Sequence, residues 1–423
     1  MATATIIKTE QSSPPADIAS VAEFVRARYA DGQQVRIVGG STALDYGPDP
    51  AGAHTLDISP YSRIVDYTPR DMTILVEAGV RMADLAATLA AEGQHLPIDV
   101  PRAGEATLGG VIATNWNGPR RYGHGTIRDY VIGIHAVDGR GVAFKGGGRV
   151  VKNVAGYDFC KLLTGSLGTL AVITQVALKV KPQPEEVRTI VGECPNLQTA
   201  DAAVARLSML ESLPVAIDLL AGKPWDAVCS GTASQAAIHL AVRIEGTNEE
   251  LTWLSDRIKS ELNTAGASEA RLLNNDDLAK LWHAQVEFPD RSPDAHASGE
   301  AASAAGQSPV IVKFIVPPTS VTNTIAQLLD FDPNATIQAH AASGIIIARF
   351  TKFTQADVSP TLVGRLRPGA TRLGGSVEVV RTTLAGLTSH LIWGGRTDSS
   401  VLLERIKKQF DPKNILNPGR YIY

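Results

Sequence analysis

The chain has 423 residues, which is too long for one ordinary domain and long enough for two or three. It is 44% hydrophobic and 20% charged, and its formal net charge of −3 gives no electrostatic reason to expect binding to nucleic acid or to an anionic membrane. The three cysteines, Cys160, Cys194 and Cys229, lie far apart and lack the C-x-x-C spacing of iron–sulfur and zinc sites. This sparse, odd number is typical of a reducing compartment and predicts no metal site.

Residues 1–14 are expected to form a flexible tail. This stretch also lacks an apolar core of the length found in signal peptides. No stretch approaches about 18 uninterrupted apolar residues, so we expect no membrane span. We therefore expect a cytoplasmic protein. A peripheral association with the inner face of the cell membrane, through a partner, stays open.

Short strands and helices alternate through the first part of the chain. Apolar residues at helical spacing predict one helix over 16–30 and another over 81–92, ending at Gly32 and Gly93. The glycine-dense stretch 99–148 has little helical period and predicts loops and short strands around a ligand. Its end, "VIGIHAVDGRGVAFKGG", is typical of a hairpin with Asp138-Gly139 as the turn. The prolines near 182–186 then indicate a domain boundary.

The remainder is expected to form a second α+β domain over residues 186–395, because longer helices alternate with strands there. The polar, low-complexity segment 290–309 is predicted to be a mobile loop inside this domain. Residues 396–423 predict a helix and a proline-rich tail. That helix would pack through one face made of Leu402, Leu403, Ile406 and Phe410.

The usual nucleotide and hydrolase motifs are missing: there is no G-x-G-x-x-G, no P-loop, no H-E-x-x-H and no G-x-S-x-G. Three loops instead combine Gly, Ser and Thr, namely "VGGSTA", "EATLGGVIATN" and "LTGSLGTLAVIT". Such loops expose backbone N–H groups and can form nests for anions, although each alone is equally typical of a simple strand turn. Three of them in one domain indicate a large, phosphate-bearing cofactor.

Four segments of the chain together resemble a known family of proteins. "RIVGGST", "VPRAGEATLGGVIATNWNGPRRYGHGTIRDYVIG", "GGGRVVKNVAGYDFCKLLTGSLGTLAVIT" and the closing "FDPKNILNPGR" resemble the PCMH-type (vanillyl-alcohol-oxidase-type) FAD-linked oxidases. The phrase "VKNVAGYDFCKLLTGSLGTL" is most similar to the FAD-binding E subunits of bacterial glycolate oxidases. The resemblance implies an α+β fold, in which a PCMH-type FAD-binding domain of two α+β subdomains spans 15–185. A smaller α+β cap domain follows, and the C-terminal segment returns to the FAD domain.

The resemblance also implies cofactor contacts. The first glycine loop would wrap the FAD pyrophosphate with its N–H groups, and Ser41 stands where many relatives have a third glycine. Ile173 would contact the adenine end, and Asn417 would reach toward the flavin. The full set of implied cofactor-binding residues is Val38, Gly39, Gly40, Ser41, Thr42, Ala43, Pro101, Thr107, Leu108, Gly109, Gly110, Ala113, Asn115, Gly165, Gly168, Thr169, Ile173 and Asn417.

Several of these residues have simpler interpretations. Gly165 and Gly168 are also typical of turns, and Leu108 of a core position. Tyr157 and Asp158 are expected to form a buried hydrogen-bonded pair rather than a catalytic one. His124 and His135 have no evident partner, which favours structural or surface roles for both.

The family resemblance suggests an electron-transfer role more than a catalytic one. The first loop has no histidine for covalent attachment, so we expect non-covalent FAD. The His-rich G-H-x-G-D-G-N-x-H segment of related 2-hydroxy-acid dehydrogenases is missing; only His340 remains, with no acidic residue near it in the sequence. This departure favours an FAD-binding subunit that oxidises glycolate to glyoxylate together with a catalytic flavin subunit and an iron–sulfur subunit.

Two other interpretations stay open. One is a self-sufficient FAD-dependent dehydrogenase or oxidase of another 2-hydroxy acid or alcohol. The other is a chain that keeps the fold but has lost FAD. No catalytic base can be named from the sequence.

Overall fold

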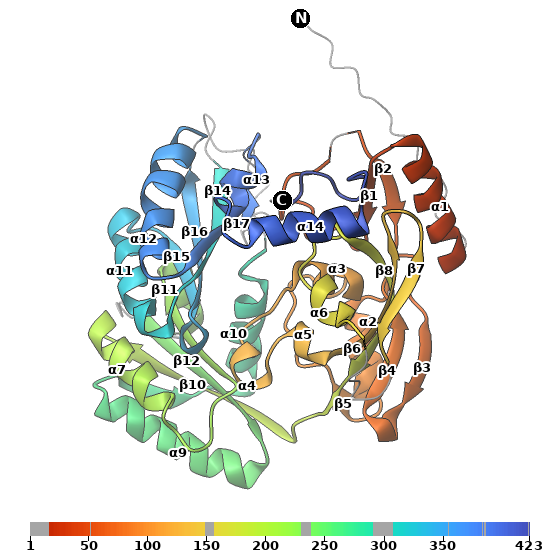
Figure 1. The fold of residues 1–423 in the computed structure, drawn as a ribbon. Helices are drawn as coiled ribbons and strands as arrows, with labels where there is room; N and C mark the ends of the chain where they lie inside the picture. Colours follow the sequence, from red (N-terminus) through yellow and green to blue (C-terminus); the bar gives the residue numbers. More distant parts are fainter. Residues whose placement is uncertain are drawn as a thin grey trace, which may run out of the picture.

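The structure is a computed structural model that describes residues 17–50, 52–148, 156–229, 238–290, 308–353, 355–382, 384, 386–421 and 423. They form two lobes that lie side by side, with the last helix crossing between them (Figure 1). The predicted tail 1–14 and most of the predicted mobile loop 290–309 lie outside the described residues. The predicted domain boundary at 182–186 falls between the last strand of the first lobe and the first strand of the second.

The first lobe is built on a five-stranded antiparallel sheet of order β3-β4-β8-β6-β7, beside a parallel pair β1-β2 and a short pair β5-β9. The two subdomains that the family resemblance implied correspond to this sheet and to the β1-β2 pair with its helices. The elements are α1 (Ile18–Asp31), β1 (Val35–Val38), β2 (His54–Asp57), β3 (Ile64–Thr68), η1 (Pro69–Asp71), β4 (Thr73–Glu77), α2 (Met82–Ala90), β5 (Gln94–His95), α3 (Leu108–Thr114), α4 (Arg121–His124), α5 (Ile127–Tyr130), β6 (Val131–Asp138), β7 (Ala143–Gly147), α6 (Phe159–Leu163), β8 (Ala171–Lys179) and β9 (Lys181–Pro182).

Two local predictions for this lobe need correction. The stretch 99–148 contains three short helices, α3, α4 and α5, where we expected loops and strands. The β6–β7 hairpin is confirmed, but Asp138 is the last strand residue rather than part of the turn. Its carboxylate accepts hydrogen bonds from the N–H groups of Arg140 and Val142, which closes a longer loop through Gly141 at φ +77°.

The second lobe is built on an eight-stranded antiparallel sheet of order β13-β10-β12-β11-β15-β16-β14-β17. This sheet is the larger of the two, whereas we expected the smaller domain here. The elements are β10 (Glu186–Cys194), α7 (Leu197–Leu207), β11 (Ala216–Ala221), α8 (Lys223–Cys229), β12 (Ile238–Gly246), α9 (Asn248–Thr264), β13 (Ser268–Leu272), α10 (Asn275–Glu287), β14 (Ser308–Ile315), η3 (Pro318–Ser320), α11 (Val321–Phe331), β15 (Thr336–His340), η4 (Ala341–Ser343), β16 (Ile345–Phe353), η5 (Gln355–Asp357), the π-helix η6 (Val358–Leu366), α12 (Arg367–Arg372), β17 (Ser376–Thr382) and α13 (Ser389–Trp393).

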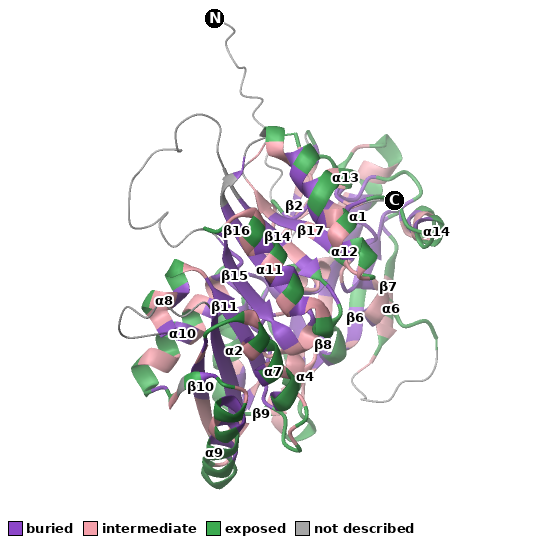
Figure 2. Cartoon of the chain, turned by 90° about the vertical axis from the view of Figure 1, so that its left-hand side faces the viewer, coloured by how far each residue is buried: buried purple, intermediate pink, exposed green. Residues whose placement is uncertain are grey.

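The eight-stranded sheet is buried on both faces, which is why its strands are nearly continuous apolar runs. Its outer face packs against α7, α9, α11 and α12, and the buried strands stand out between these helices in Figure 2. Its inner face faces the first lobe. There Leu220 and Val380 of the sheet share one apolar cluster with Tyr46 and Leu167 of the first lobe. The two lobes therefore share part of their core.

A buried charge cluster also joins the lobes. Glu245 of β12 accepts from Arg120 (Nη1, 3.2 Å), His124 (Nε2, 2.9 Å) and Arg243 (Nε, 3.2 Å). Arg120 is paired in turn with Asp99 at 2.7 Å. Burial alone would raise the pKa of Glu245, but the hydrogen bond from His124 and the charges of both arginines outweigh it and lower the pKa to about 2. His124 thus has a carboxylate partner that its sequence neighbours did not reveal.

The last helix, α14 (Ser400–Phe410), packs differently from our expectation. Leu402 is 60% exposed, so it does not belong to the buried face, and Lys407 is buried instead. The Lys407 ammonium donates to Asp411 Oδ2 (2.7 Å) and to the carbonyls of Thr169 (2.6 Å) and Leu416 (3.1 Å). The burial of Lys407 could not be predicted from the sequence, because one of its acceptors, the carbonyl of Thr169, lies 238 residues away in the chain.

The charge cluster makes the fold sensitive to acid. His95 lies beside it, and burial together with the charge of Arg120 lowers the pKa of His95 from 6.5 to about 4. His95 is therefore neutral in the folded chain at a pH where the unfolded chain binds a proton. The contribution of the neutral His95 to the free energy of unfolding should be fully present above pH 6.5 and should be lost as the pH drops from 6.5 to 4. Because His95 is partly exposed, we expect a loss of about 1–2 kcal/mol after allowing for solvent screening.

We expect the variant His95→Gln to flatten this loss between pH 6.5 and 4, as measured by chemical denaturation at each pH. The exposed His283→Gln is the matched control and should leave the steeper profile in place. Identical profiles for His95→Gln and the wild type would contradict the assignment.

Candidate functional site

A groove opens in the first lobe where the three glycine-bearing loops meet the C-terminal segment. It holds about 730 Å³ of empty space, open solvent at its mouth included. The implied cofactor residues that line it are Val38, Gly39, Gly40, Ser41, Thr42, Ala43, Thr107, Gly109, Gly110, Ala113, Gly168, Ile173 and Asn417. Segments up to 380 residues apart in the chain thus meet at one groove, where a single extended ligand could contact them all.

The first loop can turn tightly without a third glycine. Ser41 adopts the left-handed conformation at φ +56°, which costs a non-glycine residue roughly 1–2 kcal/mol. A Cβ at Gly40 would overlap the carbonyl oxygen of Glu105, and one at Gly39 would overlap Thr107 Oγ1. The two glycines are therefore required by the close approach of the second loop, and Ser41 carries the strain of the turn.

The same loop presents backbone donors to the groove. The N–H of Gly40 donates to Thr107 Oγ1 at 3.4 Å. Among the described residues, no hydrogen bond uses the N–H of Ser41, Thr42 or Ala43. Unpaired N–H groups along a glycine loop form the kind of concave nest that binds phosphate oxygens.

Five of the implied residues lie outside the groove. Pro101 lines a small neighbouring cavity, while Leu108 is fully buried in the core of the lobe. Asn115 ends α3 in the left-handed conformation, and Gly165 follows α6 with its N–H bonded to the carbonyl of Ile112. Thr169 is buried, with its hydroxyl bonded to the carbonyl of Ser166 and to the Tyr423 hydroxyl.

The two glycines of the second loop differ in what they face. A Cβ at Gly109 would meet Ala78, with the Ala78 Cβ and carbonyl oxygen both at 3.0 Å, so this glycine serves the packing of α3. At Gly110 a Cβ would meet only Thr107 Oγ1 at 3.3 Å, and Gly110 also borders the neighbouring cavity. Of these two glycines, only Gly110 therefore has room beside the position that a Cβ would take.

Sequence reasoning missed eight lining residues: Ile37, Leu44, Ile58, Ala78, Thr114, Leu167, Ala171 and Arg420. Most are apolar and carry no chemical signal. Arg420 is different, because its guanidinium is buried and donates to the carbonyls of Ala43 (2.6 Å) and Leu44 (3.0 Å). Its position directly after the "LNPG" motif was the available signal.

The neighbouring cavity lies between the groove and the second lobe. It shares Thr42, Ala43, Gly110 and Thr114 with the groove and is closed on the far side by Val380 and Arg381 of β17. It holds about 400 Å³ of empty space, a little over half of the 730 Å³ that the groove holds.

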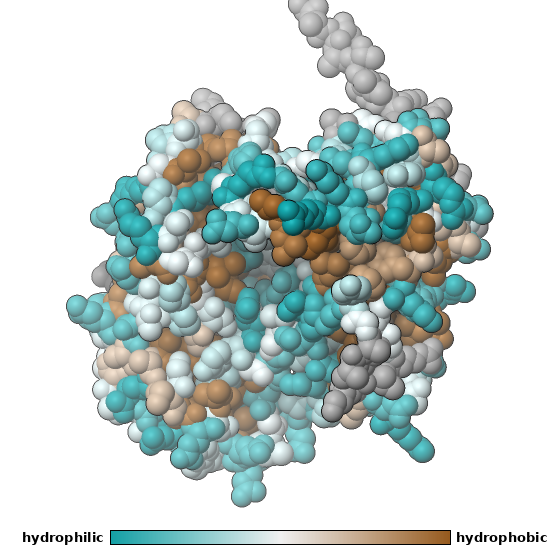
Figure 3. Space-filling view, in the orientation of Figure 1, coloured by the Kyte–Doolittle hydropathy of each residue, from teal (hydrophilic) through white to brown (hydrophobic). Residues whose placement is uncertain are grey.

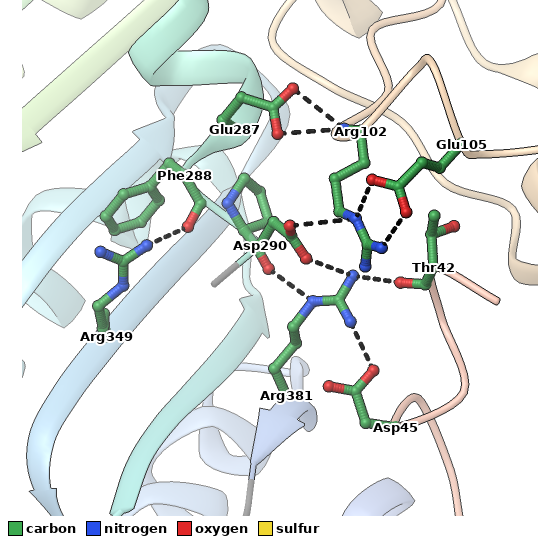
Figure 4. Close-up of polar contacts among 10 residues, drawn as sticks. Thr42, Asp45, Arg102, Glu105, Glu287, Phe288, Asp290, Arg349 and Arg381 are labelled. Atoms are coloured by element: carbon green, nitrogen blue, oxygen red, sulfur yellow. Dashed lines mark hydrogen bonds and ion pairs between the residues drawn. The ribbon is translucent and has the colours of Figure 1, made fainter. Parts of the chain in front are cut away.

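An ion-pair network seals this boundary (Figure 4). Arg381 donates to the carbonyl of Thr42 (2.6 Å) and pairs with Asp45 (2.5 Å) and Asp290 (3.1 Å). The backbone N–H of Arg102 donates to the Glu287 carboxylate at the end of α10. The cationic side chain closest to the first glycine loop from the second lobe is thus already neutralised.

The remaining candidate side chains lie away from the groove. His340 does have an acidic partner, contrary to our expectation: its Nδ1 lies 2.8 Å from Asp218 Oδ1 across neighbouring strands. Gln285 of α10 donates to the other Asp218 oxygen at 2.7 Å, so α10 covers this buried pair. His340 lines neither the groove nor the neighbouring cavity.

The expected buried pair of Tyr157 and Asp158 is wrong. Tyr157 is 85% exposed, and Asp158 caps α6 by accepting from the N–H of Lys161. In the orientation of Figure 1, Figure 3 shows hydrophobic surface in the region where α14 is drawn, and Leu402 of α14 is 60% exposed.

Metal and thiol chemistry find no support in the described residues. No group of three or more His, Cys, Asp or Glu side chains is placed to hold a metal ion there. All three cysteines are free and buried, and burial raises the pKa of the Cys229 thiol to about 12. In the described ranges, the helices are too short or too polar to span a membrane.

Comparison with known families matches the segment that carries the first two loops of the groove and the C-terminal segment that meets them. Residues 14–147 match a model described as an FAD binding domain, and residues 396–421 match the C-terminal domain of FAD linked oxidases. The chain therefore carries a PCMH-type FAD-binding domain and the C-terminal segment of FAD linked oxidases. FAD is accordingly its cofactor, and the groove fits that group, because unpaired N–H donors and a glycine cradle face the same space.

Individual relatives match either a shorter stretch of the chain at higher identity or most of the chain at lower identity. Glycolate oxidase subunit GlcE of Escherichia coli is 37% identical over 180 residues, which cover 42% of this chain and only 51% of that protein. Glycolate oxidase subunit GlcD of Bacillus subtilis is 25% identical over 398 residues, covering 90% of this chain and 82% of that protein. The chain therefore has higher identity to GlcE over a shorter stretch and lower identity to GlcD over most of its length.

Among solved structures, an alkyldihydroxyacetonephosphate synthase matches with a TM-score of 0.69 at 16% identity, covering 96% of this chain and 76% of that one. The likeness confirms the expected α+β fold across both lobes, and at this identity it extends to the fold alone.

The glycine cradle gives a direct test of the groove. We expect Gly40→Ala to lower both flavin content and stability, the latter by about 1–3 kcal/mol, because the new methyl overlaps the Glu105 carbonyl. Gly104→Ala is the matched control, since a Cβ there meets nothing within 4 Å. Flavin absorbance per protein and thermal unfolding measure both effects, and equal values for the two variants would contradict the predicted cradle.

Proposed function

We propose that the groove binds FAD non-covalently, with the pyrophosphate on the first glycine loop and the flavin ring toward the neighbouring cavity. The unpaired N–H groups of Ser41, Thr42 and Ala43 support the first part. The contiguity of the groove with the cavity through Thr42 and Gly110 supports the second. None of the described residues that line the groove is His, Cys or Tyr, the side chains able to bond a flavin covalently.

We further propose that the chain is the FAD-binding subunit of a complex that oxidises glycolate or a similar 2-hydroxy acid. Its partners would be a catalytic flavin subunit and an iron–sulfur subunit. The resemblance to GlcE over 180 residues supports this assignment. The observation that carries it is the closed boundary between the lobes.

Oxidation of a 2-hydroxy acid requires a base for the hydroxyl proton and a cation for the carboxylate, both beside the flavin. Bound FAD supplies the hydride acceptor. In the described residues the nearest cation of the second lobe, Arg381, is already paired with Asp45 and Asp290. The adjoining cavity is little more than half the size of the groove and is bounded by the paired Arg381, and His340 is buried with Asp218 beneath α10. The chain's own residues thus hold the cofactor and exclude water rather than receive a substrate.

A self-sufficient dehydrogenase is the second candidate. The match to GlcD runs through both lobes, so the second lobe is retained in full rather than reduced. If the lobes separate, Arg381 and the cavity beside Thr42 become available to a carboxylate. This alternative makes the opposite prediction for the isolated chain.

Non-covalent binding predicts that acid precipitation of the holoprotein releases all flavin into the supernatant, as measured by its absorbance. Flavin that stays with the precipitated protein would contradict the proposal.

We expect the purified, FAD-loaded chain to keep its oxidised flavin spectrum when glycolate or D-lactate is added without oxygen. Dithionite should bleach the same sample, which shows that the flavin is reducible. Addition of co-purifying subunits should restore bleaching by glycolate. Rapid bleaching of the isolated chain by a 2-hydroxy acid would instead establish the self-sufficient enzyme.

A further inference from the structure

Arg420 is a buried cation without a counter-ion. The residue is only 5% exposed, and it is among the residues that line the groove. Its Nη2 donates to two loop carbonyls, at 2.6 Å from Ala43 and 3.0 Å from Leu44. In the described part of the chain no carboxylate lies within 4 Å of it. A charge that is removed from water in this way is costly unless an opposite charge compensates it.

The two nearest acids are already committed elsewhere. Asp49 pairs with Arg36 at 2.8 Å, and Asp45 pairs with Arg381 at 2.5 Å. Their charges act on Arg420 only from a distance, and burial outweighs them, so the pKa of Arg420 lies below the usual arginine value. No carboxylate of the described chain therefore pairs with Arg420, and an anionic ligand in the groove could supply that charge.

The side chain is also held rigidly toward the groove. A Cβ at Gly47 would come within 3.0 Å of the Arg420 Cγ, so the arginine stem packs against this glycine. The Arg420 carbonyl accepts from Trp393 Nε1 at 2.9 Å, and its backbone N–H donates to the carbonyl of Asn417. The guanidinium therefore faces the loop whose N–H groups at Ser41, Thr42 and Ala43 have no partner.

We infer that Arg420 is the counter-charge for the pyrophosphate of the bound dinucleotide, delivered to an otherwise neutral loop by the C-terminal segment. Guanidinium–phosphate pairs are strong and geometrically specific, because several N–H donors face several oxygens. The N–H groups of the loop would then orient the phosphate oxygens by hydrogen bonds, and Arg420 would supply the positive charge. This inference rests on the proposed cofactor groove.

The test compares flavins with and without the pyrophosphate. Apoprotein is titrated with FAD and with riboflavin, following the flavin fluorescence, for the wild type and for Arg420→Gln and Arg420→Lys. We expect Arg420→Gln to weaken FAD binding by about 10- to 100-fold, because hydrogen bonds to a charged partner are lost. Riboflavin binding should be unchanged, and Arg420→Lys should retain most of the FAD affinity.

Arg36→Gln is the matched control, since it removes a nearby positive charge that does not line the groove. It should leave FAD affinity close to that of the wild type. A second measurement separates charge from structure: the Arg420→Gln apoprotein should unfold at the same temperature as the wild type or higher, because an uncompensated buried charge is gone.

The inference is overturned if FAD affinity is unchanged in Arg420→Gln, or if FAD and riboflavin weaken equally. An unchanged FAD affinity with a shifted flavin reduction potential would place the cation at the flavin ring instead, and a destabilised apoprotein would make it a structural clamp. Failure of the wild type to bind FAD would overturn the proposed groove itself. Reduction by glycolate is a separate measurement, so the subunit role can fail while this inference stands.

Discussion

The groove depends on the return of the C-terminal segment to the first strand of the protein. Asn417 accepts from the N–H of Ile37 (2.9 Å) and donates to the carbonyl of Leu167 (2.8 Å), so one side chain joins the first and third loops. The backbone continues this contact, because Leu416 bridges to Val35. Without this segment the three loops would have no common wall, and the space between them would be open solvent.

Buried charge then holds the returning segment in place. Lys407 and Asp411 are both almost fully buried, and the carboxylate of Asp411 also accepts from the N–H groups of Ile415 and Leu416. Such a pair is weak evidence for net stability, since its desolvation offsets much of its attraction. Its contribution is geometric: it fixes where Asn417 and Arg420 stand relative to the first loop.

Ion pairs and hydrogen bonds between charged side chains also join the two lobes. The cluster around Glu245 lies at one end of the boundary, and the network around Arg381 lies beside the glycine loop at the other. Between them, Tyr46 and Leu167 enter an apolar cluster with residues of the second sheet. Movement of the second lobe would therefore be transmitted to Thr42, whose carbonyl Arg381 holds.

Errors of sequence reasoning share one cause. Leu402 looked buried because it has helical spacing, and Tyr157 because it lies in an apolar motif, yet both depend on whether another element covers them. His340 looked unpartnered because Asp218 is 122 residues away in the chain and adjacent only across the β11–β15 ladder. Pairing across strands cannot be derived from one sequence without knowledge of the register.

The sequence by itself determined the local chemistry of this protein. Loop glycines, helix ends, apolar strands and the closing "LNPGR" are local patterns, because backbone conformation and close approach depend on residue type at a few neighbouring positions. The family resemblance added an FAD-binding fold and most residues of the groove. Only the tertiary structure decided which charges are paired. It showed Arg381 paired with Asp45 and Asp290, and among the described residues it placed no carboxylate beside the buried Arg420, because electrostatic partners are decided by distance in space.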